Sequence, residues 1–461
     1  MNVIHFVNYI CEKLTKMTNM LKRRIPIYAI GICFFISTAV EAQQNKILNL
    51  EEAITLSIAH SMQLKIESTQ LQIADSKIQQ EINTQLPQVG VSLSYIRISD
   101  NITPFKVNFP AGEVTLNPQI LNQSYNSLQI RQPIYLGGKA KAGIELLKQD
   151  KQAIYFDIEK SKLDATYSIT TLYYNLFVLK ESKKIIEANI QLLTNQQKDA
   201  QNFVTQGVLL ANDVLKLDLA IANLQSGLAE FNTNINLIKY NLCSLTGLNT
   251  NTNIDIADIL PNNAKQNSFL DEYITIALKN RPELKGLNIR QKQADLGLKL
   301  SKSDYLPTVS FGGNVNYNQP EQRIFPNRAE LTGTWNAGIF LAWNISSLYT
   351  NKEKVNESRL NVVKVNQALN QVAEGIQMEV NADYNNYLQS TEKIKIATKE
   401  VELATENFRV EQNRFSNNTT TPTEFLTANT QLVQSKINLT TATANAGLAY
   451  KKLLKSTNST N

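Results

Sequence analysis

The stretch Ala53–Ile58, which reads AITLSI, appears a second time as YITIAL at Tyr273–Leu278. The two copies are 220 positions apart, and the same spacing relates Leu86-Pro87 to Leu306-Pro307. A register that runs without gaps over about forty residues indicates an internal repeat. The sequence therefore predicts a duplicated protein.

The repeat sets the predicted domain boundaries, with a first repeat at 43–260 and a second at 261–461. Each repeat has the same predicted order: two short helices, a strand, a loop, a second strand, a very long helix, a turn and a long helix. Residues 1–42 read as a signal peptide, because a basic cluster at Lys22–Arg24 precedes an apolar run at Ile25–Val40. A membrane anchor is the alternative, although the run is short for a span of about 20 residues.

Composition and charge exclude several classes of protein. The chain has 461 residues, 43% of them hydrophobic and 19% charged, which excludes a disordered polymer and a polytopic helical membrane protein. Its net charge is +6, but residues 1–42 hold five basic and two acidic residues, and the remaining net charge of +3 is too balanced to argue for a nucleic-acid partner. Beyond the leader only one cysteine, Cys243, and one histidine, His60, remain, and these are too few for the usual zinc sites. We find no catalytic set and no phosphate-binding loop, so we expect no enzymatic activity, no metal and no cofactor.

Four runs of alternating apolar and polar residues predict β-strands. Two lie in the first repeat, at 89–95 and 128–134, and two lie in the second, at 308–318 and 331–346. One apolar face, one polar face and aromatic residues near the ends are typical of strands in a barrel that spans a lipid bilayer. A soluble sheet packed on helices is the alternative.

Four strands cannot close such a barrel, because an open sheet edge is not tolerated in hydrocarbon. Two copies of the chain would give eight strands and a barrel filled by its own side chains, whereas three copies would give twelve and an aqueous lumen. The simplest prediction is a homotrimer embedded in outer-membrane lipid. The segments between paired strands, at about 99–124 and 319–330, are rich in proline, asparagine and charge and suit extracellular loops.

Two predicted helices are too long for a compact globule. The segment from Lys139 to Thr205 contains no proline and would span roughly 100 Å as a helix, and its counterpart runs from about Tyr349 to Phe415. The heptad residues are Leu172, Leu179, Ile186 and Leu193 in the first segment and Tyr387, Ile394, Val401 and Phe408 in the second. This spacing predicts coiled-coil packing against neighbouring helices. The predicted fold class is mainly α with a membrane β-sheet, built from four strands and long coiled-coil helices in each chain.

The segment Gln132-Pro133-Ile134-Tyr135-Leu136-Gly137-Gly138-Lys139 leads from the second predicted strand into the first long helix. Together with the duplication and the order of elements, it resembles the TolC-like outer membrane efflux proteins, or outer membrane factors, over about 47–455. The second repeat departs from the pattern, because Trp343-Asn344-Ile345-Ser346 lacks the glycine pair. The resemblance implies a trimer with one twelve-stranded outer-membrane barrel above a helical periplasmic tunnel.

The resemblance also implies partners. In the family, the tunnel is closed at its far end until a periplasmic adaptor and an inner-membrane pump engage it, and the tips of the helical hairpins dock these partners. The docking residues that it implies are Gly207, Val208, Leu209 and Leu210 at the first tip and Asn417, Asn418 and Thr419 at the second.

Four further residues are implied at the periplasmic gate: Asp213, Thr420, Glu424 and Thr427. In the best-known member two aspartates three positions apart ring the pore. The first matches Glu424, and the second matches Thr427, which carries no charge. A basic gate-locking residue of that member falls near Thr420, which is also uncharged, so the familiar ionic lock keeps only the charge of Glu424 here. Two interpretations of Asp213 and Glu424 stay open: an acidic constriction, or carboxylates that suit the first turn of a helix.

The predicted function is the exit duct of a tripartite efflux or type I secretion system, which exports small molecules or proteins from the periplasm or an inner-membrane pump. The alternative is a periplasmic coiled-coil scaffold or adaptor that never enters the membrane, against which the alternating strands argue. The cargo stays open, since drugs, metal ions and polypeptides all use this architecture.

Overall fold

The structure is a computed structural model that describes residues 46–101, 103–117, 119–257, 269–325 and 327–459. The predicted signal peptide at 1–42 lies outside these residues. The chain divides into two units, Met1–Gln44 and Asn45–Asn461, and all the described helices and strands belong to the second.

The main elements follow the same order in both halves of this unit, whereas β3 and β4 occur only in the first half and α8 only in the second. The first half contains β1 (Lys46–Leu48), α2 (Leu50–His60), α3 (Met62–Asn83), β2 (Gln88–Arg97), β3 (Phe105–Phe109), β4 (Gly112–Asn117), β5 (Asn122–Tyr135), α4 (Lys139–Thr205) and α5 (Ala211–Thr246). The second half contains β6 (Ile254–Ile256), α6 (Leu270–Asn280), α7 (Pro282–Ser303), β7 (Thr308–Gln319), β8 (Thr332–Ala342), α8 (Ser347–Thr350), α9 (Lys352–Ser416) and α10 (Pro422–Thr457). The predicted sequence of two helices, two strands, a very long helix and a return helix is therefore confirmed.

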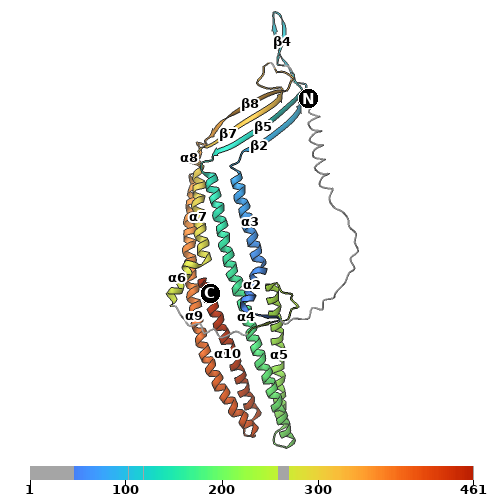
Figure 1. The fold of residues 1–461 in the computed structure, drawn as a ribbon, viewed down its shortest axis with the longest axis vertical. Helices are drawn as coiled ribbons and strands as arrows, with labels where there is room; N and C mark the ends of the chain where they lie inside the picture. Colours follow the sequence, from blue (N-terminus) through green and yellow to red (C-terminus); the bar gives the residue numbers. More distant parts are fainter. Residues whose placement is uncertain (1–45, 102, 118, 258–268, 326, 460–461) are drawn as a thin grey trace, which may run out of the picture. The chain divides into compact units, whose positions relative to one another are not determined.

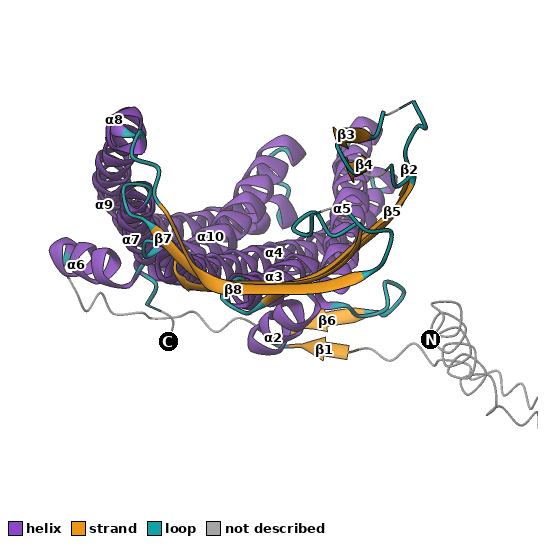
Figure 2. Cartoon of the chain, turned by 90° about the horizontal axis from the view of Figure 1, so that it is seen from above, coloured by secondary structure: helices purple, strands orange, loops and turns teal. Residues whose placement is uncertain are grey.

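The four long strands form one antiparallel sheet with the order β2-β5-β7-β8. Its centre joins the two halves of the chain, because β5 pairs with β7 along almost its full length. Seen from above, the sheet curves as an arc (Figure 2). In the described part of the chain, β2 and β8 each pair along one edge only, so both edges of the sheet are open.

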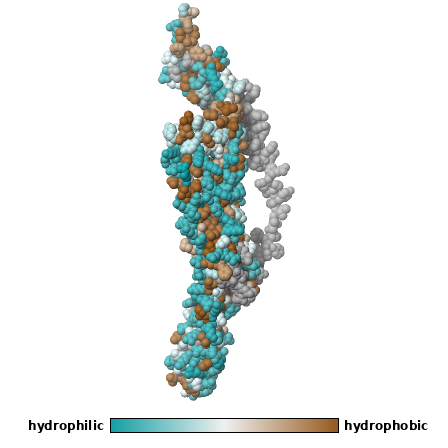
Figure 3. Space-filling model, turned by 90° about the vertical axis from the view of Figure 1, so that its left-hand side faces the viewer, coloured by the Kyte–Doolittle hydropathy of each residue, from teal (hydrophilic) through white to brown (hydrophobic). Residues whose placement is uncertain are grey.

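The long helices form two hairpins below the sheet, α4 with α5 and α9 with α10 (Figure 1). The helix α7 packs on both α4 and α9, whereas its counterpart α3 packs mainly on α4. The predicted heptad residues Ile186 and Leu193 of α4 are buried, as are Tyr387 and Phe408 of α9, so the coiled-coil spacing is confirmed. Figure 3 shows that the lower part of the hairpins is mostly hydrophilic on the side in view. None of the described helices is apolar enough over a sufficient length to cross a membrane.

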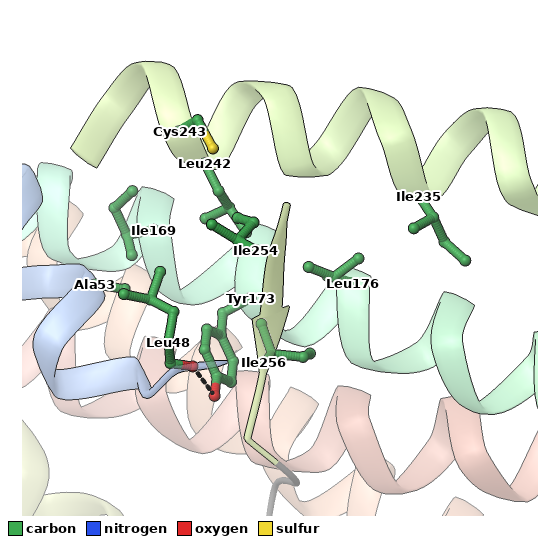
Figure 4. Packing of buried hydrophobic residues seen from close by; sticks show 10 residues of the cluster. All are labelled: Leu48, Ala53, Ile169, Tyr173, Leu176, Ile235, Leu242, Cys243, Ile254 and Ile256. Carbon is green, nitrogen blue, oxygen red and sulfur yellow. Dashed lines mark hydrogen bonds between the residues drawn. The ribbon is translucent and has the colours of Figure 1, made fainter. Parts of the chain in front are cut away.

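The strands β1 and β6 form a small parallel sheet that packs against the helices in the middle of the helical region. Leu48 from β1 and Ile254 from β6 are fully buried against Leu242 of α5 and Leu176 of α4 (Figure 4). The phenol of Tyr173 in α4 donates a hydrogen bond to the carbonyl oxygen of Leu48 at 3.0 Å. This pairing links the start of the unit to the chain that follows α5.

The structure corrects three details of the sequence prediction. The predicted order of elements has no strand after the return helix of the first repeat, but the chain after α5 contains β6. Part of this connector lies outside the described residues. The loop predicted at 99–124 contains a two-stranded ribbon, β3 with β4. The strand predicted at 331–346 ends at Ala342, because the indole of Trp343 donates to the carbonyl oxygen of Tyr305 at 3.1 Å and the chain then turns into α8.

Candidate functional site: sheet face, junction and hairpin tips

One face of the four-stranded sheet is apolar across all four strands. Val91 in β2 pairs with Leu128 in β5. Leu128 pairs in turn with Val315 in β7, which pairs with Trp335 in β8. The side chain of Trp335 is 76% exposed, and the other exposed members of this face are Val89, Leu93, Tyr95, Ile130, Phe311, Tyr317, Ile339 and Leu341. A soluble monomer rarely exposes an apolar surface of this extent, so the face requires an apolar environment.

The opposite face of the sheet is mainly polar, and its exposed apolar residues are Ile96 and Phe340. Ser92 of β2 pairs with Ser127 of β5, which pairs with Asn316 of β7 and through it with Thr334 of β8. The alternation predicted from sequence is therefore confirmed, and the register aligns the apolar sets of all four strands on the same side. A sheet of this kind separates an apolar environment from a polar one.

The first part of the strand-to-helix segment forms a bulge. The pairing of β5 with β7 shifts by one residue between Pro133 and Tyr135. Proline has no N–H to donate to a ladder, so a bulge is a position where a strand accepts it. The side-chain amide of Gln132 donates to the carbonyl oxygen of Gln85 at 2.8 Å and so ties the end of β5 to the turn after α3.

The glycine pair makes the turn from β5 into α4. Gly137 and Gly138 both have positive φ, +64° and +80°, a region that other residues adopt only with strain. A Cβ on Gly137 would lie 2.9 Å from the carbonyl oxygen of Ser303, so the close approach of α7 also requires glycine. The structure therefore explains both glycines through backbone geometry.

An acidic residue holds the junction between the sheet and the helices. The carboxylate of Asp304, at the end of α7, bonds to Lys139 Nζ at the start of α4 and lies 2.6 Å from Lys354 Nζ at the start of α9. The hydrogen bonds from Lys139 and then Lys354 lower the pKa of the Asp304 carboxyl to about 2. The hydroxyl of Ser347 in α8 donates to the carbonyl oxygen of Asp304 at 2.8 Å. One residue thus connects both strand-to-helix transitions.

Asp304 is not among the residues predicted from the sequence. A signal was nevertheless present, because a carboxylate at the C-terminal end of a helix is unfavourable next to the negative end of the helix dipole. Its position there, just before Leu306-Pro307, indicates that cations from elsewhere in the fold must surround it.

The first hairpin tip, between α4 and α5, is apolar and exposed. Gly207, with φ +74°, ends α4 in the left-handed conformation that commonly follows a helix. Val208 is exposed and Leu210 is 73% exposed, whereas Leu209 packs against the core of the tips. Asp213 accepts a hydrogen bond from the backbone N–H of Leu210 and lies 3.1 Å from Lys216 Nζ. Its charge is therefore neutralised within its own helix.

The second tip, between α9 and α10, is polar. Asn417 follows the last residue of α9, and Asn418, with φ +56°, takes the position that Gly207 has in the first tip. Asparagine tolerates this conformation better than most residues. The backbone N–H of Thr419 bonds to the carbonyl oxygen of Arg414 at 2.8 Å, which closes the turn.

Glu424 and Thr421 cap the start of α10. The backbone N–H of Glu424 donates to Thr421 Oγ1, and the carboxylate of Glu424 accepts from the backbone N–H of Thr421, both at 3.3 Å. Thr420 Oγ1 donates to the same carboxylate and is also 2.9 Å from Glu411 Oε2. The hydrogen bond from Thr420, followed by that from Thr421, lowers the pKa of Glu424 below its usual value. Glu424 therefore stays ionised, and it is exposed.

A shared core holds the two tips together. Phe425 of α10 is fully buried and stacks on Phe415 of α9 at 4.8 Å between ring centroids. Val214 and Leu217 of α5 belong to the same cluster. The structure thus brings both predicted tips to one end of the helical region, while each tip carboxylate keeps its bonds within its own hairpin.

A groove of about 450 Å³ lies between α5 and α10 beside these tips. Thr427, one of the predicted gate residues, lines it together with Lys216, the partner of Asp213. Its remaining lining residues are Leu219, Ala220, Asn223, Thr423, Leu426, Thr430 and Gln431. The groove offers apolar contact and hydroxyl groups but no free carboxylate.

The fold is similar to that of solved outer-membrane proteins. The chain resembles the solved structure of the outer membrane protein VceC from Vibrio cholerae, with a TM-score of 0.73 and 14% identity, over 88% of this chain and 95% of that one. It also resembles the Campylobacter jejuni CmeC outer membrane channel, with a TM-score of 0.69 and 14% identity, over 94% and 93% of the two chains. At this identity the likeness establishes the fold.

A curated relative is the Toxin and drug export protein A of Aggregatibacter actinomycetemcomitans. It is 24% identical over 299 residues, which cover 61% of this chain and 63% of the relative, so the match spans somewhat less than two thirds of that protein. The family model described as "Outer membrane efflux protein" matches residues 53–248 and 273–459, one stretch in each half of the chain. The chain thus belongs to the outer membrane efflux protein family, as the resemblance in its sequence implied, and it is not an enzyme.

Proposed function

We propose that this chain is one subunit of a homotrimeric exit duct that works with a periplasmic adaptor and an inner-membrane pump. The observation that carries the proposal is the open four-stranded sheet with one continuous apolar face. Both edges of that sheet offer unpaired backbone groups, which must find partners before the face can enter hydrocarbon. Three copies supply twelve strands and an aqueous lumen.

The helices support assembly from identical copies. Within the chain, α7 fits between α4 and α9, but α3 has a long helix on one side only. The apolar residues Met62, Ile66 and Ile73 are exposed along α3. If the copies repeat the arrangement inside the chain, the α9 helix of a neighbouring copy covers this row, as α4 covers α7.

The duplication gives this interface a register. In the helix α3, Ile66 corresponds to Gly286 of α7, 220 positions later. The long helices are related by 211 positions, as Tyr173 and Tyr384 show, so Phe156 of α4 corresponds to Gln367 of α9. A Cβ on Gly286 would lie 3.7 Å from the Cβ of Phe156. Ile66 of one copy and Gln367 of the next are therefore expected at a separation that suits a disulfide.

The hairpin tips are the proposed docking surface for the adaptor. The exposed Val208 and Leu210 of the first tip present apolar side chains at the far end from the sheet, next to the polar second tip. The residues proposed to meet the adaptor are Gly207, Val208, Leu209, Leu210, Asn417, Asn418 and Thr419. Glu424 is proposed to line the periplasmic aperture with Thr420 and Thr427, and the groove beside Thr427 suits a hydroxyl-rich or apolar helix surface.

The cargo is proposed as small toxic molecules or polypeptides, on the analogy of the relative whose name refers to toxin and drug export. A deletion strain tested for sensitivity to drugs and metals and for missing secreted proteins will separate these classes. In the alternative, a scaffold that never enters the membrane, high salt should extract the protein from membrane fractions, whereas an integral channel should remain.

Cysteine cross-linking tests the assembly directly. The double variant Ile66→Cys/Gln367→Cys should give disulfide-linked dimers and trimers on a non-reducing gel. The matched control, Ile66→Cys/Glu374→Cys, moves the second cysteine by two helical turns, or about 10 Å, and should not cross-link. A purified double variant that stays monomeric in detergent under oxidation would contradict the proposed trimer.

A further inference from the structure

Two charged residues lie in the four strands of the large sheet, and both are arginines. Arg97 is the last residue of β2, and Arg131 lies in the lower part of β5, near the helices. Arg97 donates a hydrogen bond to the side chain of Asn122 at 3.1 Å, at the loop end of the sheet. Arg131 has a different position, because it is four residues from the end of its strand.

The register places Arg131 on the polar face. It is two residues from Gln129, which pairs with Asn314, and four from Ser127, which pairs with Asn316. Side chains at even spacings along a strand share a face. Arg131 therefore lies on the same side as the asparagine and serine rows, opposite the apolar face.

The side chains next to Arg131 carry no charge. Its partner in β2 is Gln88, and its partner in β7 is Gly312, which pairs with Gly338 in β8. The ring of Phe340 lies over Gly312, because an added Cβ there would be 3.2 Å from Phe340 Cε2. Arg131 is exposed, and among the described residues no carboxylate pairs with it. The two acids closest to the ends of β7 are already engaged, Asp304 by two lysines and Glu321 by Asn318 and Thr334.

We propose that Arg131 sets the ion preference of the strand-lined part of the duct, which it makes selective for anions. The inference rests on the proposed trimer, in which the polar faces of three sheets enclose the lumen and three Arg131 side chains form one ring. A ring of like charges next to low-dielectric walls raises the local concentration of counter-ions. The counterpart of Arg131 in the second half, 211 positions later, is Ala342, so each copy supplies one charge to the ring.

The ligands that suit this ring are anions with carboxylate or phosphate groups, because guanidinium matches the geometry of both. Anionic cargo would be drawn into the upper part of the duct after it has passed the tips.

Ion permeability in planar bilayers tests the proposal. With a potassium chloride gradient across wild-type channels, we expect Arg131→Gln to lower the chloride-to-potassium permeability ratio by at least about two-fold. Arg97→Gln is the matched control, since it removes the other arginine of the sheet at a site outside the polar row, and it should leave the ratio unchanged. The variant Arg131→Cys allows rescue: a cationic thiosulfonate reagent should restore the wild-type ratio and an anionic one should lower it further. The one cysteine of the described residues, Cys243, is buried and should not react.

The outcomes separate the inference from the proposed function. Conducting channels whose ratio is the same in wild type and Arg131→Gln, or whose Arg131→Cys variant does not respond to either reagent, would overturn the role of Arg131 and leave the duct standing. A wild-type protein that stays monomeric and gives no conductance would overturn both.

Discussion

Replacing Asp304 with asparagine should loosen the junction where the sheet meets the long helices. The carboxylate of Asp304 is 19% exposed and joins Lys139 and Lys354, which lie in the first turns of the two longest helices. Asparagine keeps the shape of the side chain and can accept one hydrogen bond, but it removes the charge that both ammonium groups share.

The size of the effect follows from the pKa. A carboxyl whose pKa falls from 3.8 to about 2 gains close to two pKa units of preference for the charged form in the folded protein. At about 1.4 kcal/mol per unit this gives a ceiling of about 2–3 kcal/mol. The two lysines are 47% and 58% exposed, so solvent screens their attraction, and about 1 kcal/mol is the expected loss at neutral pH.

The direction of the pH dependence follows from the lowered pKa of Asp304. Because the pKa of Asp304 is lower in the folded state, its contribution is present above about pH 4 and is lost as the pH falls toward 2. Thermal unfolding of the purified protein in detergent, followed by circular dichroism, should show a lower midpoint for Asp304→Asn at pH 7. The difference between variant and wild type should shrink as the pH approaches 2.

The control is Asp75→Asn, which breaks a single exposed ion pair with Lys151 along the helices and should change the midpoint very little. Equal midpoints for Asp304→Asn and wild type at pH 7, or a difference that does not shrink in acid, would contradict the stabilising role of the Asp304 carboxylate.

Three further predictions follow from the turns and the tips. Phe425→Ala should cost about 3–5 kcal/mol of unfolding free energy, since Phe425 is fully buried and stacks on Phe415, and a denaturant titration of the helical signal measures it. Gly137→Ala should destabilise the chain by about 1–2 kcal/mol or more in the same assay, whereas Gly227→Ala, in open space within α5, should stabilise it slightly. Glu424→Gln should lower the cation preference measured at the periplasmic end. When the wild-type protein is acidified, its cation preference should fall in the same way only below pH 4.5, because the pKa of Glu424 lies below this usual carboxyl value.

The most regular elements were predictable from sequence. The helix α4 has the predicted bounds, because its 67 residues contain no proline and its heptad pattern lets apolar side chains pack against neighbouring helices. The faces of the strands were predictable for a similar reason, since alternation over ten or more residues fixes which side chains share a side.

The features that sequence did not reveal depend on contacts between distant segments. Each of β1 and β6 has three residues, which is too short for a periodic signal, and their pairing joins Ile47 to Asp255. Asp304 likewise gains its partners from the starts of α4 and α9, and no local sequence pattern predicts that these two helix starts lie beside the end of α7.

The two interpretations of the tip carboxylates can be separated by their surroundings. Asp213 is half-buried and has Lys216 beside it, so it stabilises its helix and adds no net charge to the tip. Glu424 uses Oε2 for all its described bonds, to Thr420 and Thr421, and it remains exposed and ionised. A capping carboxylate keeps its negative charge while one oxygen holds the helix start. Capping and lining an acidic aperture are therefore compatible for Glu424, and three copies would place three such charges, unlike those of Asp213, around the same opening.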